Sequence, residues 1–232
     1  MKSPHIMSTQ GIGASNGVKM LVYGKAGRGK TTLCATCPNP IIFSAESGLL
    51  ALSKYNLPFV EVKTVNDLTD LYNWCTQSSE AKQFQTICLD SLSEIAEVVL
   101  TNAKGQVKDP RQAYGELIEK MTQTIRAFRD LQNFHVYMSA KQEFTKDDTT
   151  GIMMNGPSMP GSKLSQQLPY FFDEVFQLDI GQMPDPSQTG QQLSYRFLRT
   201  QPDFQNDAKD RSGTLDATEE PNLGNIIKKI TT

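Results

Sequence analysis

The sequence predicts an α/β fold: a mainly parallel, twisted sheet with helices on both faces and antiparallel strands late in the chain. Short apolar runs alternate with helix-patterned stretches, which is typical of parallel strands joined by right-handed crossovers. The runs are continuously apolar, so we expect both faces of the strands to be covered. Late in the chain, two strand patterns are separated by turn residues instead of a helix, which predicts an antiparallel pair.

Five apolar runs are expected to form the parallel strands: 18–23, 41–44, 59–62, 86–89 and 134–138. Residues 174–178 and 193–198 are expected to form the late strands, on either side of the turn-rich stretch 181–190.

Two helices are well defined by their patterns. One spans 112–131 and carries an apolar stripe formed by Tyr114, Leu117, Ile118, Met121, Ile125 and Phe128. The other begins at Ser91, whose spacing to Glu94 fits a capping box, and ends near Gly105. Residues 143–163 are rich in Gly, Pro and Asp and are predicted to form a long irregular loop, which is usually functional or disordered.

The length of 232 residues fits one domain over 17–232, preceded by a flexible arm at 1–16 that is rich in Ser, Gly and Thr. A net charge of −2 excludes nucleic-acid binding through bulk basicity, so any basic patch must be local. No stretch approaches the ~20 apolar residues of a membrane helix, and the start lacks a signal-peptide core. We therefore expect a cytoplasmic protein without membrane contact.

The four cysteines, Cys34, Cys37, Cys75 and Cys88, lie in apolar or helix-patterned runs. Cys34 and Cys37 have the spacing of zinc ligands, but a second pair is missing. Buried free thiols are therefore the favoured interpretation.

Residues 24–31 match the phosphate-binding pattern G-x-x-x-x-G-K-[ST] in full, between an apolar run and a helix-like segment. Glycines at this spacing let successive backbone N–H groups surround phosphates. Lys30 would neutralise the β and γ phosphates of ATP, and the Thr31 hydroxyl would bind Mg²⁺. The expected nucleotide contacts are Gly24, Lys25, Ala26, Gly27, Arg28, Gly29, Lys30, Thr31 and Thr32.

Two carboxylates follow apolar strands. Asp90 ends the run 86–89 and is the expected holder of Mg²⁺, directly or through water, although it could instead cap the helix at Ser91. Glu46 follows the run 41–44 and is the candidate base that orients the attacking water. Its alternative is a solvated carboxylate that caps a helix. Nucleotide kinases need no such base, whereas a nucleoside triphosphatase does.

This order of a phosphate loop, a strand ending Ala-Glu and a strand ending Leu-Asp-Ser resembles the RecA-type ATPase core. The resemblance implies that Glu46 activates water and that Gln142 is the polar sensor, with Ser139 and Lys141 as alternatives. Gln142 could instead be an exposed loop amide. The Lys209-Asp-Arg211 stretch is similar to an element of RecA-like hexameric helicases and KaiC-type proteins. There, the two basic side chains reach the phosphates of the neighbouring subunit. A solvated turn is the alternative.

More narrowly, residues 157–164, 168–175, 198–200 and 209–211 resemble phage-encoded RecA-like ATPases of the Sak-four group, which are AAA-type ATP-binding proteins linked to single-strand annealing and recombination. The resemblance implies a place in the host cytoplasm, self-assembly as a filament or ring, and a single-strand-binding protein as a further partner. It also implies DNA-contacting loops at 104–114 and 143–164. Their candidate residues are Lys104, Lys108, Arg111, Lys146 and Lys163, each of which could also belong to an ordinary solvated surface.

The leading hypothesis is therefore an ATP-hydrolysing, self-assembling recombinase or annealing protein that binds single-stranded DNA, which stimulates its turnover. A P-loop small-molecule kinase and a nucleotide-dependent assembly or loader protein without turnover are the alternatives.

Overall fold

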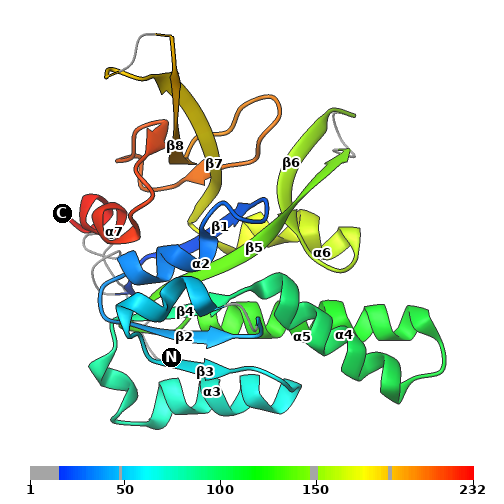
Figure 1. The fold of residues 1–232 in the computed structure, drawn as a ribbon. Coiled ribbons are helices and arrows are strands. Elements are labelled where there is room, and N and C mark those ends of the chain that lie inside the picture. Colours follow the sequence, from blue (N-terminus) through cyan, green and yellow to red (C-terminus); the bar gives the residue numbers. More distant parts are fainter. Residues whose placement is uncertain (1–15, 47–48, 147–150, 188–189) are drawn as a thin grey trace, which may run out of the picture.

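The computed structural model describes residues 16–46, 49–146, 151–187 and 190–232, and the predicted α/β class is confirmed (Figure 1). Across the sheet, the strands are β10 (Thr218–Glu219), β8 (Gln192–Arg199), β7 (Glu174–Pro184), β1 (Lys19–Gly24), β5 (His135–Lys146), β4 (Thr86–Asp90), β2 (Pro40–Ser44) and β3 (Phe59–Glu61), with β6 (Met153–Ser158) beside β5 and β9 (Lys209–Asp210) beside β7. From β7 to β3 all neighbours are parallel, whereas β6, β8, β9 and β10 pair antiparallel. The late antiparallel strands are thus also confirmed.

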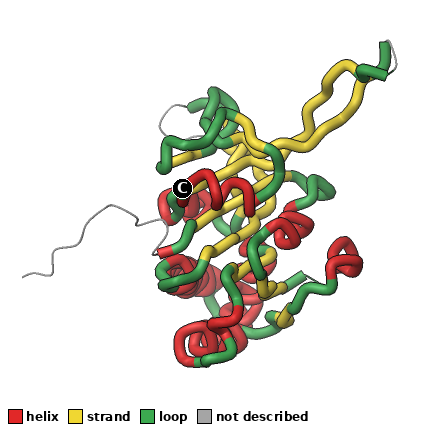
Figure 2. The backbone as a smooth tube through the Cα atoms, turned by 90° about the vertical axis from the view of Figure 1, so that its left-hand side faces the viewer, coloured by secondary structure: helices red, strands yellow, loops and turns green. Residues whose placement is uncertain are grey.

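Helical elements cover both faces of the sheet (Figure 2). One face carries α3 (Val65–Gln77), α4 (Leu92–Gln106), α5 (Pro110–Arg129), α6 (Ser162–Gln167) and 3-10 turns at Ala81–Gln83 and Leu168–Phe171. The other carries α2 (Lys30–Leu33), α7 (Leu223–Thr231) and 3-10 turns at Cys34–Thr36 and Leu49–Tyr55. Leu21 and Tyr23 of β1 point into the first core, and Met20 and Val22 point into the second. This two-sided burial explains why the run is continuously apolar.

Local signals set the helix boundaries of α4 and α5. The Ser91 hydroxyl accepts a hydrogen bond from the Glu94 N–H at 3.5 Å, which is one half of the predicted capping box, whereas the Glu94 carboxylate pairs with Lys141. Asp109 caps α5 by accepting from the Arg111 N–H at 2.9 Å, and Pro110 occupies its first turn. The buried stripe of α5 begins at Ala113, so the prediction that Tyr114 belongs to it is wrong, because that residue is 38% exposed.

The stretch predicted as a loop at 143–163 contains most of a β-hairpin. β5 continues to Lys146 and pairs with β6, from Lys141 opposite Ser158 to Lys146 opposite Met153, and α6 follows. Gly156 and Pro157 obscured this strand, because both residue types are uncommon inside strands. On the side away from β5, β6 forms a bridge between Asn155 and Asn206. Likewise β7 continues to Pro184, beyond the end predicted for it. The two hairpins, β5–β6 and β7–β8, rise above the body in Figure 1.

Two further predictions of local structure need correction. The first expected DNA loop, 104–114, is mostly helical, because α4 ends at Gln106 and α5 begins at Pro110. β3 was expected to be covered on both faces, yet all three of its residues are exposed because it lies at the edge of the sheet.

The four cysteines are free and buried, as predicted. Burial raises the pKa of the Cys75 thiol to about 12. Nearly all of the predicted arm, residues 1–15, lies outside the described residues. Within the ranges that the structure describes, no helix combines the length and apolarity needed to cross a membrane.

Candidate nucleotide-binding site

The phosphate loop connects the carboxyl end of β1 to the start of α2. Gly27 and Gly29 have φ values of 74° and 106°, which favour glycine, and a Cβ on Gly24 would lie 2.6 Å from the Leu178 carbonyl oxygen. The helix that follows has only four residues and continues as the 3-10 turn at Cys34–Thr36. A bound anion would therefore be contacted mainly by the backbone N–H groups of the loop and of this first helical turn.

The loop opens into a cavity of about 900 Å³ at the carboxyl ends of β1 and β2 and beside the middle of β5. Its lining consists of Gly24, Lys25, Ala26, Gly27, Gly29, Lys30, Thr31, Thr32, Ala45, Glu46, Ala51, Glu94, Lys141, Gln142 and Arg196. Of the predicted nucleotide contacts, Arg28 alone is missing from this lining. Its guanidinium Nε lies 3.5 Å from Asp179 Oδ1 on β7, without the geometry of a hydrogen bond.

Lys30 is folded back over the loop. Its Nζ donates to the carbonyl oxygens of Gly24 at 2.8 Å and Lys25 at 3.2 Å. Burial lowers the pKa of this ammonium, and the nearby carboxylates of Asp90 and Glu46 oppose that shift. An ammonium held by two carbonyls beside an open cavity is placed to bind phosphate oxygens.

Asp90 lies beneath the loop and is only 1% exposed. One carboxylate oxygen accepts from the Thr31 hydroxyl at 2.7 Å, and the other accepts from the Ser139 hydroxyl. Burial raises the pKa of the carboxyl group, whereas these hydrogen bonds lower it. Thr31 and Asp90 offer the oxygen ligands that Mg²⁺ prefers, so the residues fit this ion. In the described part of the chain, no group of three or more His, Cys, Asp or Glu side chains is placed to hold a metal ion. The other ligands of a magnesium ion at Thr31 and Asp90 would therefore be phosphate oxygens and waters.

Glu46 follows β2 and lines the same cavity as Lys30 and Thr31. Its Oε1 accepts a hydrogen bond of 2.6 Å from the Ser91 hydroxyl, which comes from the start of α4. Its charge also contributes to the pKa shifts of both Lys30 and Asp90. The structure therefore brings these acidic and basic groups together at one edge of the sheet, as the sequence predicted.

Gln142 lies on β5 and lines the cavity. Its Nε2 donates to Asn155 Oδ1 on β6 at 2.7 Å, and its Oε1 accepts from Gln177 at 3.5 Å. Of the two alternative sensors, Ser139 holds Asp90, and Lys141 lines the cavity while paired with Glu94. Gln142, at the base of the β5–β6 hairpin, thus combines access to the cavity with a side-chain hydrogen bond to β6.

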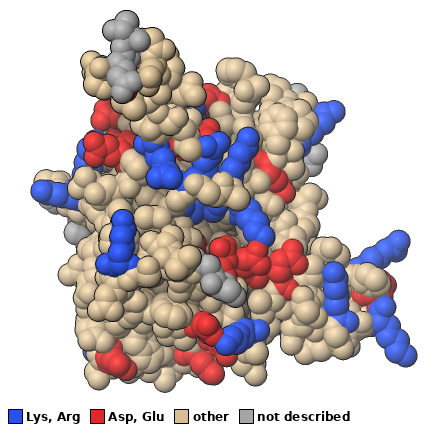
Figure 3. Space-filling view, viewed as in Figure 1, with Lys and Arg blue, Asp and Glu red and all other residues tan. Residues whose placement is uncertain are grey.

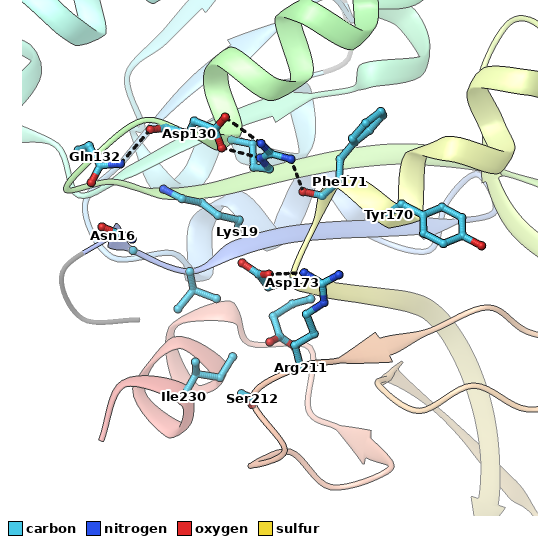
Figure 4. A pocket seen from close by; sticks show the side chains of 14 residues that line it. Asn16, Lys19, Asp130, Gln132, Tyr170, Phe171, Asp173, Arg211, Ser212 and Ile230 are labelled. Carbon is cyan, nitrogen blue, oxygen red and sulfur yellow. Dashed lines mark hydrogen bonds and ion pairs between the residues drawn. The ribbon is translucent and has the colours of Figure 1, made fainter. Parts of the chain in front are cut away.

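Lys209 and Arg211 lie outside this cavity. β9 pairs with the start of β7, at the sheet edge opposite the phosphate loop. The Lys209 ammonium donates to the Pro169 carbonyl at 2.7 Å. Arg211 forms a 2.9 Å ion pair with Asp173 and lines a separate cavity of about 560 Å³ (Figure 4). Neither side chain can serve the phosphate loop of its own chain in this arrangement.

The predicted DNA residues occupy two neighbouring regions. Lys104, Lys108 and Arg111 are exposed around the α4–α5 junction, where Figure 3 shows Lys and Arg side chains projecting from the far end of these helices. Lys163 is exposed on α6, and Lys146 is exposed near the end of β5. The Tyr114 ring links the first region to the start of α6. It lies 5.8 Å from Lys104 Nζ, and a Cβ on Gly161 would lie 3.5 Å from it.

Sequence reasoning missed Arg196 of β8, which lines the nucleotide cavity. Its guanidinium lies beside Gly29, where an added Cβ would meet Nε at 3.6 Å. Only the pairing of β8 with β7 brings this residue close to the loop, and no local motif marks it.

A glycine-lined anion cradle that joins a strand to a helix, with lysine, threonine and a buried aspartate, defines a P-loop nucleotide-binding site. A profile of the AAA domain family matches residues 16–212, and the chain belongs to this family of P-loop nucleoside triphosphatases. No curated protein matches the chain significantly in sequence. Among solved structures, a KaiC-like protein from the hyperthermophilic archaeon Pyrococcus horikoshii OT3 matches with 12% identity and a TM-score of 0.43, over 84% of each chain.

Proposed function

We propose that the protein is an ATP-hydrolysing, self-assembling recombinase or annealing protein of phage type that binds single-stranded DNA. The observation that carries the ATPase part is that Lys30 and Glu46 line one open cavity, with the Asp90 carboxylate buried directly beneath the loop and close enough to Lys30 to affect the pKa of that ammonium. A nucleotide store would need the cradle but not a carboxylate such as Glu46 beside it.

In the proposed reaction, the Glu46 carboxylate orients a water molecule and accepts one of its protons. The water oxygen forms a bond to the γ phosphorus, the bond from that phosphorus to the bridging oxygen breaks, and its electron pair leaves with ADP. Lys30 and the loop N–H groups stabilise the charge on the phosphates. Thr31 and Asp90 would hold Mg²⁺, which adds positive charge against the β and γ phosphates when bound.

The DNA surface in this proposal comprises the α4–α5 junction, the start of α6 and the β5–β6 hairpin. Exposed cations at Lys104, Lys108 and Arg111 suit a phosphate backbone, and the half-exposed Tyr114 ring beside them suits base stacking. The bond from Gln142 to Asn155 connects the nucleotide cavity to the hairpin. The occupancy of the cavity can therefore influence the DNA surface through a direct contact.

Assembly completes the proposed site. Lys209 and Arg211 lie far from their own phosphate loop, so a role for them in hydrolysis requires a neighbouring subunit, in a filament or a ring. A single-strand-binding protein is the proposed further partner on the DNA.

The test is ATP turnover with and without single-stranded DNA, for the wild-type chain and Glu46→Gln. We expect DNA to stimulate turnover. We also expect Glu46→Gln to lower turnover by about 10²- to 10³-fold while it retains ATP binding, because the amide cannot accept the proton. Transfer of phosphate to an acceptor would instead indicate a kinase, and binding without turnover would indicate a loader. Turnover that is unchanged in Glu46→Gln contradicts the assigned role of this residue.

A further inference from the structure

The β7–β8 hairpin contacts the phosphate loop at three successive points. At the base of the hairpin, the Leu178 carbonyl lies so close to Gly24 that only glycine fits. One residue further along β7, Asp179 pairs with Arg28. On β8, Arg196 is opposite Ile180 and lies beside Gly29. These three contacts fix the hairpin against the phosphate loop, and they place Arg196 beside Gly29.

The Arg196 side chain differs in its pairing from Arg28, Lys141 and Arg199, and it resembles Lys25 and Lys30 of the loop itself, which also form no ion pair with a described carboxylate. Arg28 pairs with Asp179, Lys141 pairs with Glu94, and Arg199 pairs with Asp203. Among the described residues, Arg196 has no carboxylate within 4 Å, although it lines the cavity together with Lys30 and Thr31. The hairpin thus brings an uncompensated guanidinium to a site that is built to take an anion.

We infer that Arg196 binds the phosphates of the nucleotide held by its own chain and stabilises the charge that develops on them during hydrolysis. A guanidinium presents a planar fork of donors that matches two phosphate oxygens, whereas an ammonium acts as a point charge. An arginine placed in this way contributes mainly to kcat, because the charge it meets increases toward the transition state. This inference rests on the proposed ATP hydrolysis, and it adds a same-chain arginine to the arginine expected from a neighbour.

The first experiment compares ATP affinity and turnover in the wild-type chain, Arg196→Ala, Arg196→Gln and Arg196→Lys. We expect Ala and Gln to lower kcat by about 10²-fold with a smaller loss of affinity, and Lys to retain part of the rate. Lys228→Ala removes a cation from the exposed face of α7 and should match the wild type. Thermal unfolding checks that each variant is folded, and two folded neutral variants within twofold of the wild type in both kcat and affinity would overturn the inference.

The wild-type chain and the variants report on different claims. A wild-type chain without turnover defeats the proposed hydrolysis. The ratio of ATP affinities then decides the role of Arg196: a tenfold loss in Arg196→Ala supports phosphate contact, and equal affinities reject it.

A mixing experiment tests whether the arginine serves its own chain. Arg196→Ala retains an intact phosphate loop, and Lys30→Ala retains an intact arginine. Mixed assemblies should stay inactive, because no single chain then holds both groups. If mixing restores turnover, Arg196 acts on a neighbour and the same-chain assignment is wrong. In a parallel mixture, Arg211→Ala with Lys30→Ala should regain activity, since Arg211 is expected to act across the interface.

Discussion

Single buried polar side chains carry the nucleotide site. Asp90 is enclosed by the sheet and by α2, and its two oxygens accept hydrogen bonds from hydroxyls on different elements. Two neutral donors do not fully replace water around a carboxylate, so the pKa of Asp90 remains raised. A group kept for metal binding can therefore destabilise the fold in which it lies.

The first prediction is that the Asp90 carboxylate lowers the stability of the folded protein at neutral pH. The pKa of Asp90 is raised above the usual 3.8, so the folded state holds its proton at pH values where the unfolded chain has lost it. The Asp90 contribution to stability then falls as pH rises through this window. At neutral pH, we expect Asp90→Asn to raise the free energy of unfolding of the nucleotide-free protein by about 1 kcal/mol while ATP turnover is lost.

Urea unfolding at neutral pH measures this change. Asp67→Asn is the control with the opposite sign, because hydrogen bonds from the backbone at Lys63 and Thr64 lower the pKa of Asp67. That variant should be slightly less stable than the wild type. An Asp90→Asn protein less stable than the wild type would contradict the account.

At the scale of elements, helix ends and hairpins form the regions proposed to bind DNA. The α4–α5 junction projects away from the sheet in Figure 1, and Tyr114 lies in the first turns of α5, on the side facing α6. The side chain is packed against neither core and the residue is 38% exposed, which leaves part of the ring open to a base.

The second prediction follows from this position. Tyr114→Ala should weaken single-stranded DNA binding by about 1–3 kcal/mol, because base stacking on an aromatic ring has that magnitude, and Tyr114→Phe should retain the affinity. Tyr55→Ala is a matched control. Tyr55 is 41% exposed and has Lys54 Nζ 4.9 Å from its ring centre, but it belongs to the turn on the other face of the sheet. Fluorescence anisotropy with a labelled oligonucleotide measures the three affinities, and equal losses in Tyr114→Ala and Tyr55→Ala would reject the proposed surface.

At the scale of the whole molecule, a second polar region lies where the parallel strands begin, at the end of the sheet remote from the phosphate loop. Glu174 is 2% exposed, and its burial, together with nearby Asp210, raises the pKa of the carboxyl group to about 8. Lys19 is also buried and donates to the carbonyls of Leu131 and Phe134, and burial lowers its pKa to about 8. Both pKa values therefore lie near 8, that of Glu174 because it is raised and that of Lys19 because it is lowered.

The third prediction is a minimum in their joint contribution to stability near pH 8. Between pH 4.5 and about 8, Glu174 keeps a proton in the folded state that the unfolded chain has lost, so stability falls as pH rises. Between about 8 and 10.5, the unfolded chain holds the proton of Lys19 more tightly, so stability rises with pH. Each group changes the slope by at most ~1.4 kcal/mol per pH unit.

Guanidinium unfolding over about pH 5 to 10 measures this profile. Glu174→Gln should remove the fall below pH 8 and leave the rise above it, whereas Lys19→Met should do the reverse. A Glu174→Gln profile that runs parallel to the wild type would show that Glu174 titrates normally.

The sequence predicted those parts of the molecule in which a local pattern of residues is typical of a single structure. The apolar runs identified the central strands, and the phosphate-loop spacing identified Lys30, Thr31 and, with the strand ends, Asp90 and Glu46. It failed where long-range pairing decides. β6 contains glycine and proline and is a strand only because β5 supplies a partner. Arg196 reaches the cavity only through the register of β8 on β7.

The burial of the four native cysteines has a practical consequence for labelling experiments on this protein. Alkylating dyes react with exposed thiolates, whereas all four native thiols are buried, and burial also raises the pKa of the Cys75 thiol. A single cysteine introduced on an exposed position, such as Ser194 of β8, would therefore take up a fluorophore alone, with no need to replace the natural residues. Movements of the upper hairpins during nucleotide turnover could then be followed in an otherwise unaltered chain.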